Sequence, residues 1–313
     1  MSETTFANRL SAADQRSRRP TSTLHRSRTR FGLVLLVPFA VLNAAVIVVP
    51  SLATVFYSFT DWTGVGPASW VGLDNYVRLA GEGDFYSALS HNLIWTGIHL
   101  TVPIGLALLG AAILARIRRA QVLLRLLYFL PYTVASVVTA SVWQDLLDPE
   151  RGVSRLSSFL GIDLPDDLVL LGNQATALPT IAMINVWALW GFLLVIFLSA
   201  MQGVDDRLYE AARIDGANVL QEFWHVTVPG ILPTLVFVVL ISIMWSLLAF
   251  DYVWIITQGG PAGATELVST LLYREAFQRF DVGYAASLGL SLTFISGLII
   301  AGFLLLQKKG WTV

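Results

Sequence analysis

The chain consists of long apolar runs separated by polar segments. In the hydrocarbon core of a membrane every backbone polar group must be satisfied within its own segment, and a helix of roughly 20 apolar residues crosses that core. The pattern therefore predicts an all-α membrane protein with six transmembrane helices. Their predicted ranges are residues 31–59, 91–115, 122–143, 177–201, 232–257 and 284–306.

The first apolar run, 31–59, is 29 residues long. A cleaved signal peptide has an apolar core of roughly 7–15 residues, so we expect this run to be a retained first helix, with an interfacial extension as an alternative use of its length. Proline removes a backbone hydrogen bond and clashes with the preceding turn, so Pro38 and Pro50 predict kinks.

The composition agrees with a membrane protein. Of the 313 residues, 55% are hydrophobic and 13% are charged, with a mean hydropathy of +0.67, whereas soluble domains are roughly 45–50% apolar. The net charge of −1 hides a strong segregation along the chain, so it indicates neither a nucleic acid nor an acidic substrate. The absence of cysteine excludes disulfides and thiolate catalysis.

Residues 1–30 differ from the rest of the chain. They hold seven arginines, two acids and many Ser and Thr, without apolar periodicity. Such a segment cannot bury enough apolar surface to fold. We expect a disordered basic cytoplasmic tail over 1–30 and a six-helix transmembrane domain over 31–313.

The loops carry charges of opposite sign on the two sides of the predicted membrane. The tail, the loop 116–125 and the end at 308–309 hold 13 basic and two acidic residues. Five basic and 14 acidic residues occupy the other side, in loops 60–90, 144–176 and 251–283. The positive-inside rule places both termini in the cytoplasm, and the segment 202–232 with them. That segment, with two basic and five acidic residues, contradicts the rule taken alone.

The polar segment 202–232 predicts two short helices. Asp205 and Asp206 suit a helix start, and Gly216 suits the left-handed residue that ends a helix. Asn218 followed by Gln221 resembles a capping box. We therefore expect a bent, compact element, in which small side chains leave room for a partner surface to approach.

The same segment carries a spaced motif. Glu210-Ala211-Ala212, three residues, Gly216, nine residues and then Val226-Thr227-Val228-Pro229 is similar to the coupling-loop signature of permease subunits of binding-protein-dependent ABC importers. The resemblance implies the type I importer permease fold and a loop that docks into a separate ATPase. The residues implied in this coupling are Glu210, Ala211, Ala212, Asp215, Gly216 and Pro229. The alternative is an ordinary polar loop that contains Glu-Ala-Ala.

Two further stretches resemble carbohydrate-type permeases within that family. They are Tyr128-Phe129-Leu130-Pro131 with Trp143, and Thr257-Gln258-Gly259-Gly260-Pro261 with Thr265 and the run from Tyr273 to Phe277. The resemblance implies a sugar importer in the cytoplasmic membrane of a bacterium or archaeon. Its implied partners are a second permease subunit, most often non-identical, two ATPase subunits and an extracytoplasmic solute-binding protein. ATP and magnesium would be bound by the ATPase, and this chain would bind no cofactor.

Polar groups in membrane helices are costly, and Asn185 is the amide inside the predicted fourth span. One helical face carries Asn185 with Ala188, Leu189 and Phe192, and the fifth span repeats that spacing with Ser242, Trp245, Ser246 and Ala249. Placed by their distance from the coupling motif, these eight positions match the sugar pocket of the maltose permease that the chain resembles. They are the predicted substrate pathway. The alternative is that these polar groups bond to neighbouring helices and the tryptophans only pack.

No motif for catalysis is present. The chain lacks the Gly-x4-Gly-Lys-Ser/Thr loop that holds ATP phosphates, and its four histidines lack metal-ligand spacing. Asp163, Asp166 and Asp167 are expected to be a solvated acidic loop and not a metal site, after a short amphipathic piece near 153–160. Asp251 is expected to be an interfacial carboxylate near the outer end of its span, with a gate as the alternative.

Two other functions stay open at this point. One is an importer for another solute such as glycerol phosphate, which would need basic groups in the cavity. The other is an ion-coupled secondary carrier or a membrane sensor without an ATPase. A carrier should have carboxylates and broken helices at the membrane midplane, and the apolar runs predict neither.

Overall fold

The computed structural model describes residues 35–117, 119–148, 152 and 170–308. Within them, five helices are long and apolar enough to cross a membrane, or six if a bent pair counts as one span. The chain divides into a first unit that ends at Phe56 and a second that begins at Tyr57, and each is described by itself. The predicted tail 1–30, the amphipathic piece near 153–160 and the acidic loop at 163–167 lie outside the described residues.

The first span is helical from Leu35 to Tyr57. It contains a π-helical turn, η1 (Ala44–Val48), followed by α3 (Val49–Tyr57), and the N–H of Val49 donates to the carbonyl of Ala44, five residues earlier. Pro50 comes two residues after this widened turn. Both π-turns and prolines are recognised sources of helix bending. The kink predicted at Pro38 stays a prediction.

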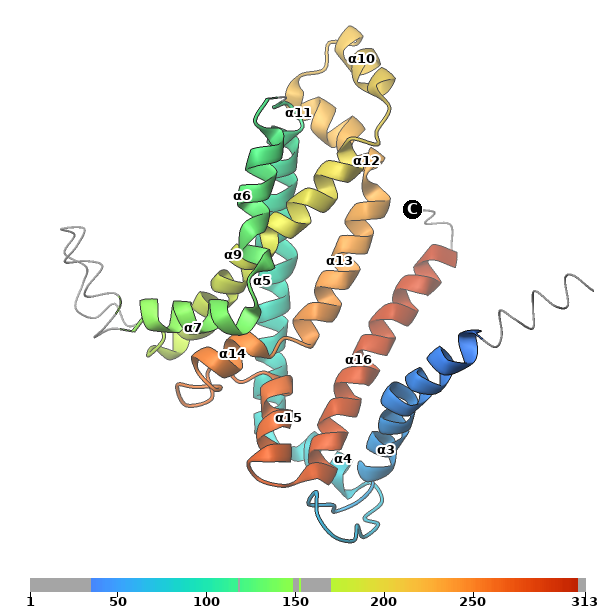
Figure 1. Ribbon diagram of the computed structural model, residues 1–313, viewed down its shortest axis with the longest axis vertical. Coiled ribbons are helices and arrows are strands. Elements are labelled where there is room, and N and C mark those ends of the chain that lie inside the picture. The colour runs from blue at the N-terminus through green and yellow to red at the C-terminus, as the bar shows by residue number, and fades with distance from the viewer. Residues whose placement is uncertain (1–34, 118, 149–151, 153–169, 309–313) are drawn as a thin grey trace, which may run out of the picture. The chain divides into compact units, whose positions relative to one another are not determined.

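The second unit is built from helices that follow one another along the chain. The first of these are α4 (Asp74–Gly81), α5 (Gly83–Leu114), α6 (Gln121–Thr133), α7 (Ser136–Leu146) and α9 (Gln174–Met201). The polar segment follows with α10 (Asp206–Ile214), α11 (Val219–Glu222), the π-turn η3 (Phe223–Thr227) and α12 (Val228–Gly230). The last are α13 (Leu232–Leu247), α14 (Asp251–Ile256), α15 (Val268–Phe277) and α16 (Val282–Lys308). In this unit α10 and α11 lie at one end and α4 and α15 at the other (Figure 1).

The third predicted span is not one helix, which corrects the prediction for 122–143. α6 and α7 meet at an angle of 87°, with extended backbone at Val134 and a similar ψ of 136° at Ala135. Pro131 cannot donate to the preceding turn, and the hydroxyl of Thr133 donates to the carbonyl of Leu130 at 2.7 Å. The last turn of α6 therefore closes on itself and the chain leaves it at nearly a right angle.

The fifth predicted span is also interrupted. α13 ends at Leu247 and α14 begins at Asp251, so three residues of the run 232–257 are not helical. The hydroxyl of Ser269 donates to the carbonyl of Ala249, which the break removes from the helical ladder. Such side-chain partners allow a broken helix inside a membrane. The runs 122–143 and 232–257 are therefore not the continuous helices that the sequence predicts.

The main core lies where α5, α9 and α13 pack. Leu193, Leu194, Phe197 and Leu198 of α9 are fully buried there, together with Ala107 and Ala111 of α5. The small side chains of α5 allow the two long helices to approach closely, as is usual in membrane bundles.

The loop between α14 and α15 holds the Thr257–Pro261 stretch singled out in the sequence. The hydroxyls of Thr257 and Thr265 are 2.8 Å apart and close this loop. Gly259 has φ +88°, and a Cβ there would lie 2.6 Å from the carboxylate of Glu266. The stretch is therefore a tight turn, in which position 259 requires glycine because of its positive φ and the nearby carboxylate.

Gly191 allows α6 to contact the backbone of α9. A Cβ at Gly191 would lie 1.7 Å from the carbonyl oxygen of Tyr128, so the backbone itself would have to move. We expect Gly191→Ala to destabilise the protein by at least about 1–3 kcal/mol, the scale of overpacking. Gly105→Ala is the matched control, because no atom lies within 4 Å of a Cβ there. Thermal unfolding of the purified protein measures both, and an unchanged midpoint for Gly191→Ala would contradict the packing.

Candidate transport cavity and coupling loop

A cavity of about 330 Å³ opens where the two broken spans meet α5 and α9. This volume is at the lower end of the range for small-molecule sites, roughly 300–1,000 Å³. Six of the eight predicted pathway residues line it: Asn185, Leu189, Ser242, Trp245, Ser246 and Ala249. The predicted faces of α9 and α13 therefore do converge on one space.

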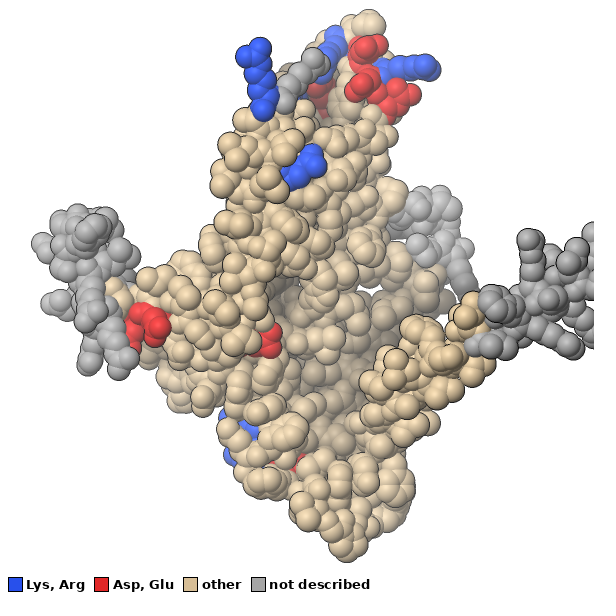
Figure 2. Space-filling view, viewed as in Figure 1, with Lys and Arg blue, Asp and Glu red and all other residues tan. Residues whose placement is uncertain are grey.

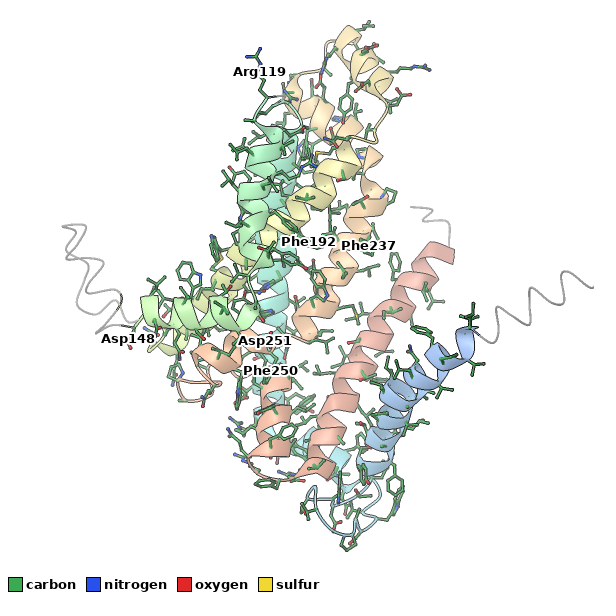
Figure 3. The ribbon with its side chains drawn as sticks, in the orientation of Figure 1. Arg119, Asp148, Phe192, Phe237, Phe250 and Asp251 are labelled. Atoms are coloured by element: carbon green, nitrogen blue, oxygen red, sulfur yellow. The ribbon has the colours of Figure 1, made fainter. Side chains whose placement is uncertain are left out.

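The other two predicted residues do not line this cavity. Ala188 is buried and packs in the core beside Tyr252. Phe192 stacks on Tyr132, with ring centroids 4.4 Å apart and planes 15° apart, and its ring centroid is 6.0 Å from that of Trp245. Tyr132 and Trp245 both line the cavity, so Phe192 packs against two rings of its wall (Figure 3).

Nine lining residues lie outside the predicted pathway set. They are Trp95 and His99 of α5, Tyr132 of α6, Ser136 of α7, Leu248 and Phe250 at the break, and Asp251, Tyr252 and Val253 of α14. His99 could have been predicted from the sequence, because an imidazole within an apolar span is costly unless it has partners. Ser136 and Tyr132 could not have been predicted, because they reach the cavity through the bend between α6 and α7.

Asn185 is bonded to a neighbouring helix. Its side-chain amide oxygen lies 2.6 Å from Nε2 of His99, and Nδ1 of His99 lies 2.9 Å from the carbonyl oxygen of Trp95. This is the alternative that the sequence left open. Because both Asn185 and His99 still line the cavity, the pair forms a fixed polar group on its wall.

The two serines of α13 have different surroundings. The hydroxyl of Ser246 donates to the carbonyl of Ser242 at 2.7 Å, within the same helix. The hydroxyl of Ser242 is buried and has no hydrogen-bond partner among the described residues. A buried unpaired hydroxyl costs about 1–3 kcal/mol. Ser242 is therefore the cavity group best suited to a polar ligand.

Asp251 is the first residue of α14, directly after the break in the fifth span, and it lines the cavity (Figure 3). The hydroxyl of Ser136 donates to its carboxylate oxygen Oδ2 at 2.5 Å. Ser136 begins α7 and Asp251 begins α14, so this bond joins the second halves of the two broken spans. A carboxylate in the first turn of a helix is also favoured by the helix dipole.

The polar segment folds as its sequence predicts. The side chain of Asp205 accepts from the N–H of Arg207 at the start of α10, Gly216 has φ +81°, and Asn218 with Gln221 forms a complete capping box. The hydroxyls of Tyr209 and Thr227 are 3.0 Å apart and hold α10 against η3. As in the first span, the π-turn ends two residues before a proline, here Pro229.

The surface of this segment differs from that of the long helices. Charged side chains gather at the end formed by α10 and α11, whereas the surface along the helices is almost free of charge in this view (Figure 2). Glu210 and Ala211 are exposed, and Ile214, at the end of α10, is 86% exposed. The same segment also exposes Leu208, Val219, Leu220 and Trp224. Several exposed apolar side chains rimmed by polar residues are typical of a protein-binding surface, whereas a single one is ordinary.

Residues 101–308 match the family described as the binding-protein-dependent transport system inner membrane component. The chain belongs to this family. Its members are multi-pass permeases, so the chain is a transport subunit and not an enzyme. This membership also decides against the secondary carrier and the membrane sensor, which the broken spans had left open.

Relatives of this permease carry sugar transport in their names. The chain is 30% identical to the diacetylchitobiose uptake system permease protein NgcF of Streptomyces coelicolor, over 96% of this chain and 91% of the relative. It is also 30% identical to the multiple sugar-binding transport system permease protein MsmF of Streptococcus mutans, over 88% and 94%. Both matches cover most of each chain.

The fold of this permease is that of a solved importer. A bacterial ABC transporter involved in the import of the acidic polysaccharide alginate matches with a TM-score of 0.79 and 22% identity, covering 91% of this chain and 97% of that one. The predicted importer permease fold is therefore confirmed. No group of side chains that could hold a metal ion occurs among the described residues.

Proposed function

We propose that this permease imports a sugar, forms half of the translocation pathway, and is driven by a separate ATPase that docks on α10. The observation that carries the proposal is the cavity between the broken spans. It combines hydrogen-bonding groups with aromatic rings, and its Ser242 hydroxyl has no partner among the described residues. The sugar-transport names of NgcF and MsmF support the same solute class.

The chemistry of the cavity suits a sugar. Sugars offer hydroxyls to polar groups and C–H faces to flat aromatic rings, as pockets for polar ligands require. Ser242 and Asn185 supply the first kind of contact, and Trp245 and Tyr132 supply the second. A phosphate ester such as glycerol phosphate would need basic groups, and no Lys or Arg lines the cavity in the described part of the chain.

The coupling role rests on α10. Its exposed face presents Glu210, Ala211 and Ile214, and Gly216 turns the chain sharply at its end. ATP binding would bring the two coupling loops of a permease pair together and turn the cavity outward, and hydrolysis would reset it. This is alternating access by rigid-body movement. ATP and magnesium would be held by the ATPase, and this chain would hold no cofactor.

The remaining partners follow from the same proposal. A second, non-identical permease completes the pathway, two ATPase subunits bind at the α10 end, and the solute-binding protein binds on the opposite side. The charge of the loops supports an orientation with both termini and α10 in the cytoplasm.

Uptake by the purified complex tests the solute class. The complex, with its binding protein, is placed in proteoliposomes with ATP, and uptake of radiolabelled diacetylchitobiose, maltose and glycerol 3-phosphate is compared. We expect ATP-dependent uptake of a sugar. Uptake of glycerol 3-phosphate alone would overturn the proposal.

Replacement of Ser242 by alanine separates binding from folding. A buried hydroxyl without a partner costs stability. Its removal should therefore leave the free energy of unfolding unchanged or raise it, by up to about 1–3 kcal/mol. If the hydroxyl binds the sugar, uptake should still fall, by about fivefold or more for one lost hydrogen bond. The control is Ser246→Ala, because that hydroxyl is already bonded within its helix. Unchanged uptake by Ser242→Ala would remove this residue from the pathway.

A further inference from the structure

Glu222 differs from the other acidic residues of the polar segment. Asp205, Asp206, Glu210 and Asp215 are exposed, whereas Glu222 is buried, with 5% of its surface exposed. A buried carboxylate is stable only when it is paired. The partners of Glu222 therefore indicate what this position does.

The two oxygens of Glu222 bind arginines from two different elements. Oε1 accepts from Nε of Arg213 at 2.9 Å, and Arg213 lies in the last turn of α10. Oε2 lies 3.6 Å from Nη2 of Arg116, in the turn that follows α5. The hydrogen bond that Arg213 donates to Glu222 raises the pKa of the Arg213 guanidinium above its usual value. One carboxylate thus joins the proposed docking helix to the cytoplasmic end of α5.

α5 leads directly from this junction to the cavity. It is continuous from Gly83 to Leu114, and it carries Trp95 and His99 on the cavity wall, where His99 contacts Asn185 of α9. α5 has no break between this junction and His99, although Pro103 lies inside it, so it can carry a displacement of one end to the other. Movement of its cytoplasmic end would therefore change the position of the His99–Asn185 pair.

We propose that Glu222 is a positioning residue, through which displacement of α10 by the ATPase is passed to α5 and so to the cavity. This rests on the proposed function of α10. Arg213 connects the carboxylate to α10, and Arg116 connects it to α5. Because Glu222 is buried and paired with Arg213 and Arg116, its proposed role is to connect these two elements and not to contact the solute or the ATPase.

The absence of native cysteine allows a direct test. A single cysteine at Ala249 in the cavity is labelled by a membrane-impermeant maleimide added outside right-side-out vesicles, with and without ATP and vanadate inside. The labelling rate is measured on this chain after it has been purified from the vesicles. The Ala249→Cys protein without further substitutions is the parent protein. In it we expect a clear change in the labelling rate between vesicles with and without nucleotide.

Three variants in that background carry the test. Glu222→Gln and Arg116→Gln should each reduce the nucleotide-dependent change about fivefold, within the range for residues that carry coupling, while the ATPase still co-purifies. Arg119→Gln should keep the full change, because Arg119 is an exposed cation in the same turn with no ion pair among the described residues (Figure 3).

Several results would overturn the proposal. A full nucleotide response in Glu222→Gln or in Arg116→Gln would do so, as would loss of the ATPase from Glu222→Gln, which would make the residue part of the docking surface. If the parent protein itself binds no ATPase, the proposed function fails, and the two failures are thereby distinguished.

Discussion

Gly216→Pro is expected to abolish uptake while leaving the protein in the membrane. Gly216 has φ +81°, whereas proline fixes φ near −65°. Its N–H donates to the carbonyl of Arg213 at 3.1 Å, and proline has no such donor. The turn between α10 and α11 would therefore open, and the docking face would no longer be held in place. ATP-dependent uptake, with membrane content measured by immunoblot, checks this.

Gly216→Asn is the matched control. Asparagine adopts the left-handed conformation more readily than other residues with a side chain, and a Cβ at this position would meet no atom within 4 Å. We expect this variant to keep most of the uptake. Full uptake by Gly216→Pro would show that α10 does not couple the ATPase to the membrane helices.

Asn185→Leu should impair transport strongly without loosening the ATPase. Leucine removes the group that lies 2.6 Å from Nε2 of His99 and leaves a buried imidazole nitrogen without its partner. The loss of one such hydrogen bond in a buried site costs about 1–3 kcal/mol, which corresponds to roughly five- to 150-fold in uptake rate. Uptake kinetics and co-purification of the ATPase are measured on the same preparation.

Met183→Leu is the control for this variant. Met183 lies on the same helix, two residues away, and is exposed. Its replacement should leave uptake unchanged. Unchanged kinetics in Asn185→Leu would mean that this amide only packs two helices together.

The sequence was most informative where local chemistry decides the structure. The caps at Asp205 and Asn218 and the turn at Gly216 depend on residues within one helical turn, and all three were predicted. The two breaks were not predicted, because apolar residues continue through them. A break depends on partners from elsewhere in the chain, such as Ser269 for the carbonyl of Ala249.

The cavity could be predicted only in part for a related reason. Helical spacing placed Asn185 and Ser242 on the correct faces of their own helices. It could not indicate which other helices face them, so His99 and Tyr132 were missed. Ala188 fell on the predicted face but faces the core, since a helical face is wider than the wall of a small cavity.

The central claim is that this permease works as one subunit of an ATP-driven importer. Purification of the tagged chain from its native membrane, with mass spectrometry of the proteins that accompany it, tests this most directly. We predict recovery of an ATPase and a second permease subunit. Glu210 is exposed on α10, so the Glu210→Lys variant should no longer recover the ATPase. Recovery of the chain alone, under conditions that keep other importers intact, would contradict the account.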